Sequence, residues 1–384
     1  MVEAFGLIKL LKTKFFERKH KMARIVFITN SIGFGGAEKM LTFVANSLSE
    51  RGHRCAIVNL GTVPEYVNAY KQSIDERIDV FNMKDKIQQK NRKAEISAVA
   101  QYAKEFRADV LIGFTNFPNM YACIVGRMLR IPSIMSERGD PKKTLSNTFK
   151  DRILKLIINS ASGGVFQTDG AMSFYGKRLR MRGIIIPNPI FIKGTVPDVP
   201  YEEREKTVVS VGRLDNVQKR LDIMLKSFSI FLRKHPKYTL KIYGSGDDEN
   251  AARQWCVELN IQDNVCFMGV TKTPMQDIAR DGMFLITSDY EGISNSLLEA
   301  MAVGLPCVST DHTPGGARLL ITDHENGLLA PMGDAEALAK AMCEFADSPE
   351  LAQKCGNNAR DVVNRFEPKK ITDMWEDYIE KVCR

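Results

Sequence analysis

Short runs of apolar residues alternate with longer stretches in which apolar residues recur every three or four positions. The short runs are typical of buried strands, and the longer stretches are typical of amphipathic helices. In the first half of the chain this pattern predicts strands at residues 24–29, 54–60, 110–114, 132–135, 163–166 and 183–186. It also predicts a helix that ends near residue 50 and helices at residues 95–106, 120–129 and 145–159. Strands that alternate with helices form right-handed βαβ units, so we expect a parallel sheet covered by helices.

The series is interrupted by Pro187-Asn188-Pro189 and by a charged connector at 190–206 that has little apolar periodicity. A second alternation follows, with strands predicted at residues 207–211, 240–243, 265–267, 283–286, 307–310 and 327–329. The chain then becomes mostly helical, with helices predicted at residues 335–345, 349–364 and 368–382. Because 384 residues exceed the size of one ordinary core, we expect two α/β domains that meet near residue 190.

The first 22 residues carry a different pattern. Phe5, Ile8, Leu11 and Phe15 are three or four positions apart, and this segment holds six Lys and Arg against two Glu. Such a segment is typical of a basic amphipathic helix that lies in a membrane interface. A disordered basic leader, or an extension ahead of a start at Met22, would account for the same pattern.

The formal net charge of +8 is unevenly distributed. Residues 1–192 contain 31 Lys and Arg against 16 Asp and Glu, whereas residues 193–384 contain 23 against 30. Residues 137–182 hold ten cations against four carboxylates, so a basic surface belongs to the first half. A basic surface favours an anionic partner such as lipid or nucleic acid. Aromatic residues make up only 8% and are not interleaved with the cations, which argues against nucleic acid.

Eight cysteines are scattered without a Cys-x-x-Cys pair, and the five histidines are equally dispersed. Neither pattern predicts a structural metal site or a disulfide framework. No apolar run approaches the ~20 residues that a bilayer-spanning helix needs, and no cleavable signal peptide is visible. We therefore expect a cytoplasmic protein.

A glycine-rich turn follows the first predicted strand, where the sequence reads Asn30-Ser31-Ile32-Gly33-Phe34-Gly35-Gly36-Ala37-Glu38. Glycines at a strand-to-helix turn allow the backbone to approach a phosphate or a sugar closely. The spacing differs from the dinucleotide-binding fingerprint, because the position that needs a third glycine holds Glu38. No acidic residue ends the next strand either, so a nicotinamide-dependent dehydrogenase is disfavoured.

The strongest candidate for chemistry follows the fourth predicted strand of the second half, where Glu291 and Gly292 lie in the turn before a helix. The carboxyl ends of strands are where open α/β sheets bind their ligands. Ser294 or Asn295 can cap that helix and leave its free N–H groups facing the ligand. Glu299 lies four residues after Asn295 on the same face, where a sugar or ribose diol would supply hydroxyl donors. Compensation of the helix dipole is the simpler explanation for this carboxylate.

Two other strand ends of the second half carry glycines. Gly212, Arg213 and Lys219 follow the strand at 207–211, with Lys219 expected at the start of a helix, and Gly244 follows the next strand. Arg213 can bind a diphosphate through two parallel hydrogen bonds, and Lys219 can add a point charge. A solvated basic turn is the alternative. Cations for a diphosphate and carboxylates for hydroxyls at strand ends of one sheet together suggest a nucleotide-sugar.

These motifs resemble the signature of the family four retaining glycosyltransferases. The longest part of the resemblance is the run Glu-Gly-x-x-Asn-x-Leu-Leu-Glu-Ala-Met-Ala-x-Gly-x-Pro at residues 291–306. Shorter matches lie at residues 35–38, 186–189, 212–214, 244–246 and 327–331, so the resemblance covers nearly all of residues 24–380. It implies the GT-B fold, in which two Rossmann-like α/β domains with parallel sheets face each other across a cleft.

The resemblance also implies a division of labour between the domains. Residues 1–22 would be an extension, and residues 23–190 would form the acceptor-side domain. The final helix at 368–384 would cross back and complete that domain, whereas residues 191–367 would bind the nucleotide-sugar.

Each matching residue then has an implied role. Glu291 would hold the donor sugar, and Glu299 would hold the ribose hydroxyls. Arg213 and Lys219 would neutralise the departing diphosphate, and Gly36 would let the first domain close on the donor. The remaining donor-binding positions are backbone contacts at Gly35, Gly212, Gly244, Gly292, Ile293, Ser294 and Asn295.

Many members of this family place a histidine after the fourth or fifth strand of the first domain, in contact with the donor sugar. Here the corresponding turn reads Ser136-Glu137-Arg138-Gly139-Asp140-Pro141 and contains no histidine. This resembles a subgroup that acts on lipid-linked oligosaccharides, polysaccharides and lipopolysaccharide cores. We expect Arg138 to contact the sugar or the acceptor.

The implied reaction moves a hexosyl unit from a nucleotide diphosphate to a glycan acceptor with retention of the anomeric configuration. Uridine diphosphate is the commonest donor nucleotide in the resembling family, and the acceptor would be lipid-linked at the cytoplasmic face of an anionic membrane. No metal or other cofactor is expected, because the cations take that part. A nucleotide-sugar 2-epimerase of similar fold and a catalytically idle sugar-nucleotide-binding scaffold are the two alternatives.

Overall fold

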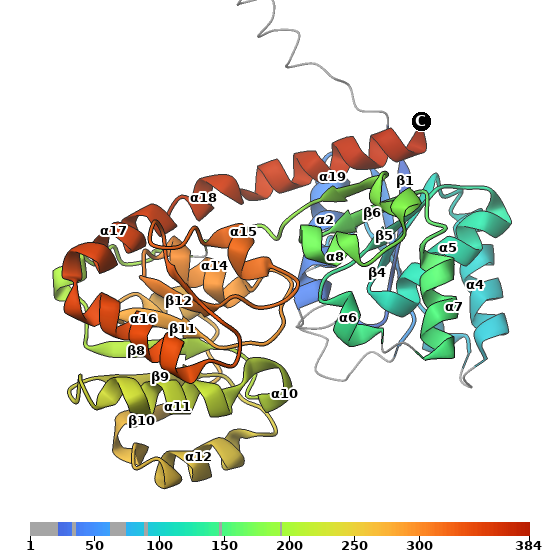
Figure 1. The fold of residues 1–384 in the computed structure, drawn as a ribbon. Coiled ribbons are helices and arrows are strands. Elements are labelled where there is room, and N and C mark those ends of the chain that lie inside the picture. Colours follow the sequence, from blue (N-terminus) through green and yellow to red (C-terminus); the bar gives the residue numbers. More distant parts are fainter. Residues whose placement is uncertain (1–21, 33–35, 62–73, 88–90, 146–147, 193) are drawn as a thin grey trace, which may run out of the picture.

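The computed structural model describes residues 22–32, 36–61, 74–87, 91–145, 148–192 and 194–384. Two α/β domains lie side by side, and the chain crosses between them twice (Figure 1). The first crossing precedes β8 (Thr207–Val211), and the second is the helical segment that ends in α19 (Pro368–Cys383). Each domain has its own parallel sheet, so the fold class predicted from the alternating pattern is confirmed.

The N-terminal sheet has seven parallel strands in the order β3-β2-β1-β4-β5-β6-β7. These strands are β1 (Arg24–Thr29), β2 (Arg54–Asn59), β3 (Asp79–Asn82), β4 (Val110–Phe114), β5 (Ser133–Ser136), β6 (Gly163–Phe166) and β7 (Gly183–Ile185). The central strands are buried on both faces, because helices cover both sides of a parallel sheet.

Alternate residues of the N-terminal strands pack against two different layers of helices. In β1, Val26 and Ile28 face a layer that contains α4, α5 and α7, whereas Ile25 and Phe27 face α2 and α19. The helices of this domain are α2 (Gly36–Glu50), η2 (Met83–Asp85), α4 (Arg92–Glu105), α5 (Asn116–Leu129), α6 (Pro141–Thr144), α7 (Phe149–Ile158), α8 (Asp169–Ser173) and α9 (Lys177–Arg180).

The C-terminal sheet has six parallel strands in the order β10-β9-β8-β11-β12-β13. Its strands after β8 are β9 (Thr239–Tyr243), β10 (Val265–Gly269), β11 (Met283–Ile286), β12 (Cys307–Thr310) and β13 (Leu328–Ala330). The strands at 207–211, 283–286 and 307–310 begin and end at the predicted residues. They contain only apolar residues, Ser and Thr, and nearly all of these residues are buried, so their limits could be predicted from the sequence.

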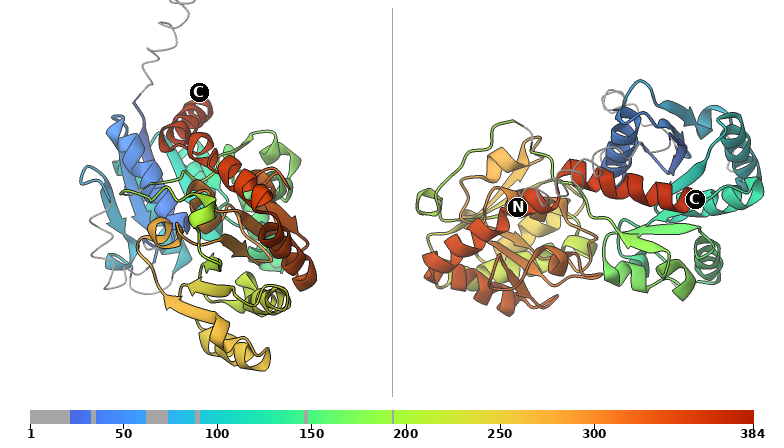
Figure 2. Two further views of the ribbon diagram at one scale, coloured as in Figure 1. Left: turned by 90° about the vertical axis from the view of Figure 1, so that its left-hand side faces the viewer. Right: turned by 90° about the horizontal axis from the view of Figure 1, so that it is seen from above.

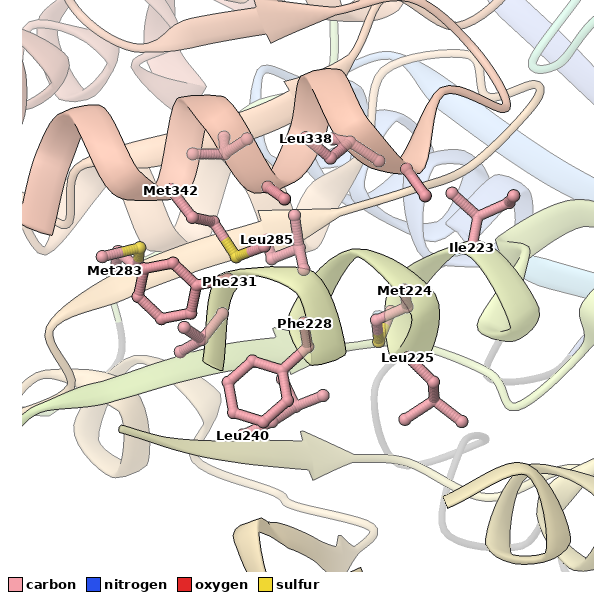
Figure 3. Packing of buried hydrophobic residues seen from close by; sticks show 14 of the residues in the cluster. Ile223, Met224, Leu225, Phe228, Phe231, Leu240, Met283, Leu285, Leu338 and Met342 are labelled. Atoms are coloured by element: carbon pink, nitrogen blue, oxygen red, sulfur yellow. The ribbon is translucent and has the colours of Figure 1, made fainter. Parts of the chain in front are cut away.

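The larger core of the C-terminal domain lies between its sheet and a pair of helices. Figure 3 shows Phe231 of α11 beside Met283 of β11 and Met342 of α16, whereas Phe228 of α11 points toward Leu240 of β9. The helices of this domain are η3 (Tyr201–Glu203), α10 (Asn216–Lys219), α11 (Leu221–Leu232), α12 (Glu249–Glu258), η4 (Gln262–Asn264), α13 (Pro274–Ile278), α14 (Asn295–Ala302), α15 (Gly316–Leu320), α16 (Ala335–Asp347), α17 (Pro349–Ala359) and α18 (Val362–Arg365).

Several elements differ from the predicted pattern: α5 begins four residues earlier than predicted, and the limits of helices such as α11 and α12 were not predicted. Three further differences have a local cause. β3 is an edge strand with a polar residue at each end, so it lacks the apolar run by which the other strands are predicted. The helix predicted at 145–159 begins only at Phe149, because Thr148 caps it through a capping box. The helix predicted at 349–364 ends at Ala359, and the short helix α18 follows it.

The last helix of the chain, α19, belongs to the N-terminal core although it follows the C-terminal domain in sequence. Seen from above, it runs from the C-terminal domain onto the N-terminal domain (Figure 2). Trp375 is fully buried there, and its ring stacks on Phe114 with centroids 5.7 Å apart. The hydroxyl of Tyr378 accepts a hydrogen bond from the N–H of Gly164 at 2.7 Å. Burial of this apolar face fixes the second crossing between the domains.

The basic segment predicted at 1–22 lies outside the described residues except for Met22. Among the helices that the structure describes, none combines the length and the apolar character needed to cross a membrane.

We expect Trp375→Ala to lower the free energy of unfolding by about 3–5 kcal/mol, because it empties a fully buried aromatic site. Trp375→Phe should cost much less, because a ring remains stacked on Phe114 and the indole N–H has no hydrogen-bond partner among the described residues. Urea unfolding followed by circular dichroism measures both variants. If the phenylalanine variant is as unstable as the alanine variant, the stacked ring does not hold α19 in place.

Candidate active site between the two domains

The carboxyl ends of both sheets point toward the boundary between the domains. β8 lies between β9 and β11 in the C-terminal sheet, and β1 lies between β2 and β4 in the N-terminal sheet. At such a switch point the loops diverge to opposite sides and leave a crevice, which is where open α/β sheets bind ligands. Loops of the two domains make hydrogen bonds to each other at this edge, so both sheets contribute to one candidate site.

Lys219 and Glu291 form an ion pair in this crevice although 72 positions separate them in sequence. Lys219 ends the short helix α10, which Asp215 caps. The hydroxyl of Thr287, at the end of β11, donates to the carbonyl of Lys219 at 2.8 Å. The hydroxyl of Ser288 donates to Oε1 of Glu291 at 3.2 Å. Because the two charged side chains are only 17% and 13% exposed, each needs the other as a partner.

Two glycines make room for this ion pair. A Cβ at Gly244, whose φ is +139°, would lie 1.8 Å from the carbonyl oxygen of Gly212, so only glycine fits there. A Cβ at Gly212 would lie 3.4 Å from Nζ of Lys219. The lysine side chain therefore lies directly against the glycine turn. A small hollow lined by Gly212, Lys219 and Ser288, among other residues, adjoins it.

The arginines of this region are placed differently from the sequence expectation. Lys219 and Arg220 do not open a helix: Lys219 ends α10, and Arg220 adopts a left-handed conformation (φ 53°) before α11 begins. Arg220 then pairs with Asp289. Arg213 is exposed, and its Nη2 donates to Asp215 at 2.8 Å. Arg213 thus lies on the rim of the crevice, and Lys219 is the inner cation.

The helix α14 begins at the edge of the same crevice. Ser294 caps it by accepting a hydrogen bond from the N–H of Leu297 at 3.4 Å. Asn295, the first helical residue, accepts a hydrogen bond from Asn188 of the N-terminal domain at 2.8 Å. Glu299 is half-buried one turn further along α14, on the same side as Asn295.

Asn188 makes four hydrogen bonds, two within the N-terminal domain and two to the C-terminal domain. Its Oδ1 accepts from Gln167 at 2.8 Å and from Nη2 of Arg138. Its Nδ2 donates to Asn295 and, at 3.4 Å, to the carbonyl of Ile293. Gln167 in turn accepts from the N–H of Ile293 at 3.3 Å. Since Asn188 and Gln167 follow β7 and β6, two strand ends of the first domain bind the loop that precedes α14.

Arg138 carries its charge into this interface. Its Nε and Nη1 are buried and have no hydrogen-bond partner among the described residues. Burial lowers the pKa of Arg138 to about 9, and the neighbouring Glu137 only partly opposes this effect. Glu137 is itself buried, which raises its pKa, and its carboxylate accepts a hydrogen bond from Tyr175 at 2.6 Å. A buried guanidinium with unpaired N–H groups is suited to bind a polar or anionic group of a ligand.

The backbone at Gly292 sets how closely the domains approach. A Cβ there would lie 1.8 Å from Oε1 of Gln167 and 2.7 Å from the carbonyl oxygen of Arg138. On the neighbouring loop, the hydroxyl of Thr313 donates to Oδ2 of Asp140 at 2.6 Å. Gly292 is therefore needed for contact between the domains.

His312 is a residue of this site that the sequence analysis missed. It follows β12, is 1% exposed, and neither ring nitrogen has a hydrogen-bond partner among the described residues. The position of Gly316 shows where the ring lies. A Cβ at Gly316 would be 3.0 Å from Cε1 of His312 and 1.6 Å from the carbonyl oxygen of Gly292, so the ring of His312 is close to the backbone of Gly292. Burial lowers the pKa of His312, although the charge of Glu291 opposes this. Its position in the sequence, two residues after a buried strand, is the feature by which His312 could have been predicted as a site residue.

The structure brings most of the predicted site residues together. Gly35 lies outside the described residues. Gly36 begins α2, and a Cβ there would make an ordinary contact of 3.6 Å with Nδ2 of Asn295, so this arrangement leaves room for a side chain. The other predicted positions that lie at the interface or on the loops facing it are Arg138, Gly212, Gly244, Glu291, Gly292, Ile293, Ser294, Asn295 and Lys219. In the described part of the chain, no group of three or more His, Cys, Asp or Glu could hold a metal ion.

Comparison with known proteins identifies related sequences. The family described as "Glycosyl transferases group 1" matches residues 196–362, which include the Lys219–Glu291 pair and Glu299. An uncharacterized glycosyltransferase of Haemophilus influenzae is 25% identical over 362 residues, which are 92% of this chain and 99% of the relative. The lipopolysaccharide 1,6-galactosyltransferase of Escherichia coli is 34% identical over 155 residues, 39% of this chain and 42% of that protein. These similarities support a glycosyltransferase family for the chain.

Solved structures share the same two-domain architecture. HepE of Anabaena in complex with UDP and glucose has a TM-score of 0.79 at 18% identity and covers 94% of this chain and 100% of its own. The lipopolysaccharide outer core galactosyltransferase WaaB, in its apo form, has a TM-score of 0.75 at 21% identity and covers 93% of this chain and 99% of its own. The fold is therefore GT-B, as the resemblance of the motifs implies.

We expect Gly292→Ala to open the contact between the domains, because the added methyl group overlaps the side chain of Gln167. The N–H of Ile293, which Gln167 binds, should then exchange with solvent about fivefold faster, as loss of one hydrogen bond worth about 1 kcal/mol implies. Hydrogen exchange with mass spectrometry measures this. Gly139→Ala is the matched control, because no atom lies within 4 Å of a Cβ at Gly139. Equal exchange in the two variants would contradict the assigned contact.

Proposed function

We propose that this chain is a retaining glycosyltransferase that moves a hexosyl unit from a UDP-sugar to a glycan acceptor. The proposed acceptor is linked to a lipid, and the protein acts at the cytoplasmic face of the membrane as a peripheral protein. The observation that carries the proposal is the Lys219–Glu291 pair, which lies against the glycine turns after β8 and β9. A cation for phosphate and a carboxylate for hydroxyls therefore lie side by side at the switch point of the sheet.

Lys219 has the position needed to stabilise the departing diphosphate. Negative charge grows on the leaving phosphate during transfer, and a preorganised cation lowers the barrier. The charge of Lys219 is balanced by Glu291 in the structure. We propose that phosphate oxygens replace Glu291 as the partner of Lys219 when the donor binds. Glu291 is then free to accept hydrogen bonds from the sugar, and neither buried charge is left unpaired.

The start of α14 supplies the remaining donor contacts. Its first N–H groups and the loop at Gly292 point into the crevice beside Glu291, and a helix N-terminus favours negative charge. Glu299, one turn along, is placed to accept hydrogen bonds from a ribose diol. Arg213 on the rim would add a second cation for the phosphates.

The opposite wall of the crevice favours attack on the same face that the diphosphate leaves. Its carboxylates are engaged, because Glu137 is bound by Tyr175, and Asp140 caps α6 and is bound by Thr313. Neither is therefore free to act as a nucleophile on the sugar. We propose that the leaving phosphate assists the acceptor hydroxyl on one face, which retains the anomeric configuration. Arg138, with two unpaired N–H groups, would bind the sugar or the acceptor.

The similar proteins support the choice of donor and acceptor. HepE of Anabaena was solved in complex with UDP and glucose, and TarM of S. aureus in complex with UDP. A Campylobacter jejuni relative, 24% identical over 94% of this chain and 99% of its own, is named as an N-acetyl-D-galactosaminyltransferase for a PP-undecaprenol-linked glycan.

With UDP-hexoses and a lipid-linked glycan, the protein should release UDP and form a glycoside with the anomeric configuration of the donor, as NMR would show. Lys219→Ala should lower kcat by about 10²–10³, because loss of one preorganised oxyanion donor costs about 2.7–4 kcal/mol. Glu299→Ala should raise the KM for the donor. Lys226→Ala, an exposed cation on α11, is the matched control and should leave turnover unchanged.

Three outcomes would contradict the proposal. The first is turnover at the wild-type rate by a purified and folded Lys219→Ala variant. The second is a glycoside with inverted configuration. The third is conversion of the donor to a free isomeric nucleotide-sugar without any acceptor, which would indicate an epimerase.

A further inference from the structure

The helix α7 (Phe149–Ile158) is apolar on two opposite sides. Its inner residues Leu154 and Ile158 are buried in the N-terminal core. On its outer side Phe149, Ile153 and Leu156 are 78%, 44% and 72% exposed. These three residues are three or four positions apart, so they form one continuous outward face, which we call the outer face of α7.

The outer face is bordered by cations. Lys150 and Arg152 are exposed on its two flanks, and Lys142 and Lys143 are exposed on the preceding helix α6. Asp151 is the carboxylate of α7, and it is engaged in the capping box with Thr148. The surface that adjoins the three apolar side chains is therefore positively charged.

The helix is held firmly, so its exposed side chains are a stable feature. The capping box fixes its first turn, and Nζ of Lys155 lies 3.6 Å from the ring centroid of Phe174. At its other end the side chain of Asn159 accepts a hydrogen bond from the N–H of Gly176 at 2.7 Å. Gly176 precedes α9, which adds Lys177, Arg178 and Arg180 beside the end of α7.

We propose that the outer face of α7 is a lipid-contact surface that docks the N-terminal domain on an anionic bilayer. Apolar side chains on one side of a helix, with cations on both flanks, match the boundary between acyl chains and anionic headgroups. Phe149, Ile153 and Leu156 enter the acyl region, while Lys150 and Arg152 extend their charges to the headgroups. Charge complementarity favours anionic lipid over a neutral surface.

The position of α7 connects this surface to the crevice between the domains. Nζ of Lys143 lies 5.5 Å from the ring centroid of Tyr290, the residue that precedes Glu291. Phe149 follows Lys143 by six residues, a span of at most about 20 Å. A lipid-linked acceptor in a bilayer under α7 is then close to the proposed donor site. This second step rests on the proposed function, whereas the lipid contact does not.

Sedimentation of the full chain with vesicles tests the lipid contact. Wild type should bind vesicles of phosphatidylcholine and phosphatidylglycerol at low salt, more weakly at high salt, and pure phosphatidylcholine vesicles least. Phe149→Ser/Leu156→Ser should reduce binding to the anionic vesicles at least about tenfold, because two large apolar side chains no longer leave water. Met268→Ser/Val270→Ser, which changes two exposed apolar residues of the C-terminal domain, is the matched control and should bind like wild type.

The proposal is overturned if the α7 variant binds the anionic vesicles as well as wild type does. It is also overturned if wild type does not bind them, or if the control variant loses binding to the same extent. Light scattering measures the oligomeric state of the same proteins. If wild type is an oligomer that the α7 substitutions dissociate, the outer face of α7 is a contact between copies of the chain, which also overturns the proposal. Sedimentation does not involve turnover, so failure of the lipid contact and failure of the proposed reaction are read separately.

Discussion

The ion pair between Lys219 and Glu291 depends on the strand order of the sheet, on the end of α10 and on the glycine turns beside it. The two residues meet because β8 and β11 are neighbours in the sheet, although the chain forms two further strands between them. α10 must end where it does, and the Thr287 hydroxyl holds that end against β11. The turn after β9 must be glycine, because any side chain at Gly244 would strike the backbone of Gly212. Two charges that are largely withdrawn from water are stable only together, so whatever ligand displaces one must replace it. A diphosphate with an attached sugar can satisfy both at once.

A second constraint concerns the two domains. Each has its own hydrophobic core, and each must supply one side of the crevice. α19 follows the C-terminal domain in sequence and packs into the N-terminal core through Trp375, which stacks on Phe114. At the crevice the contact is polar: Asn188 binds both the Arg138 side and the Asn295 side, and Gly292 allows the backbones to approach. A polar contact of this kind can be exchanged for hydrogen bonds to a ligand at little cost, whereas an apolar core could not. The buried N–H groups of Arg138 that have no partner among the described residues are in the right place for such an exchange.

The limits of many strands could be predicted from the sequence, because a local run of residues determines where such a strand begins and ends. Short runs of apolar and small residues located β4, β6, β8, β11 and β12 to the residue, because a strand buried on both faces tolerates few charged side chains. The prediction failed for elements whose limits depend on contacts with other parts of the chain or on a capping residue. β3 is a half-buried edge strand, and the start of α7 depends on Thr148. Arg213 and Lys219 look equivalent in sequence, yet the side chain of Arg213 is exposed beside Asp215, whereas that of Lys219 is largely buried beside Glu291. His312 and Gln167 were missed because each belongs to a run of polar residues after a strand, and only the folded structure shows which of them is buried at the site.

We propose that a phosphate group replaces Glu291 as the ion-pair partner of Lys219 when the donor binds. Isothermal titration calorimetry with UDP tests it most directly, because the two members of the pair should respond with opposite signs. Lys219→Met should weaken UDP binding by about 10–100-fold, since a hydrogen bond to a charged group contributes about 1.5–3 kcal/mol. Glu291→Gln should bind UDP at least as tightly as wild type, because the phosphate no longer has to displace a carboxylate. If Glu291→Gln weakens UDP binding as much as Lys219→Met does, the exchange does not occur.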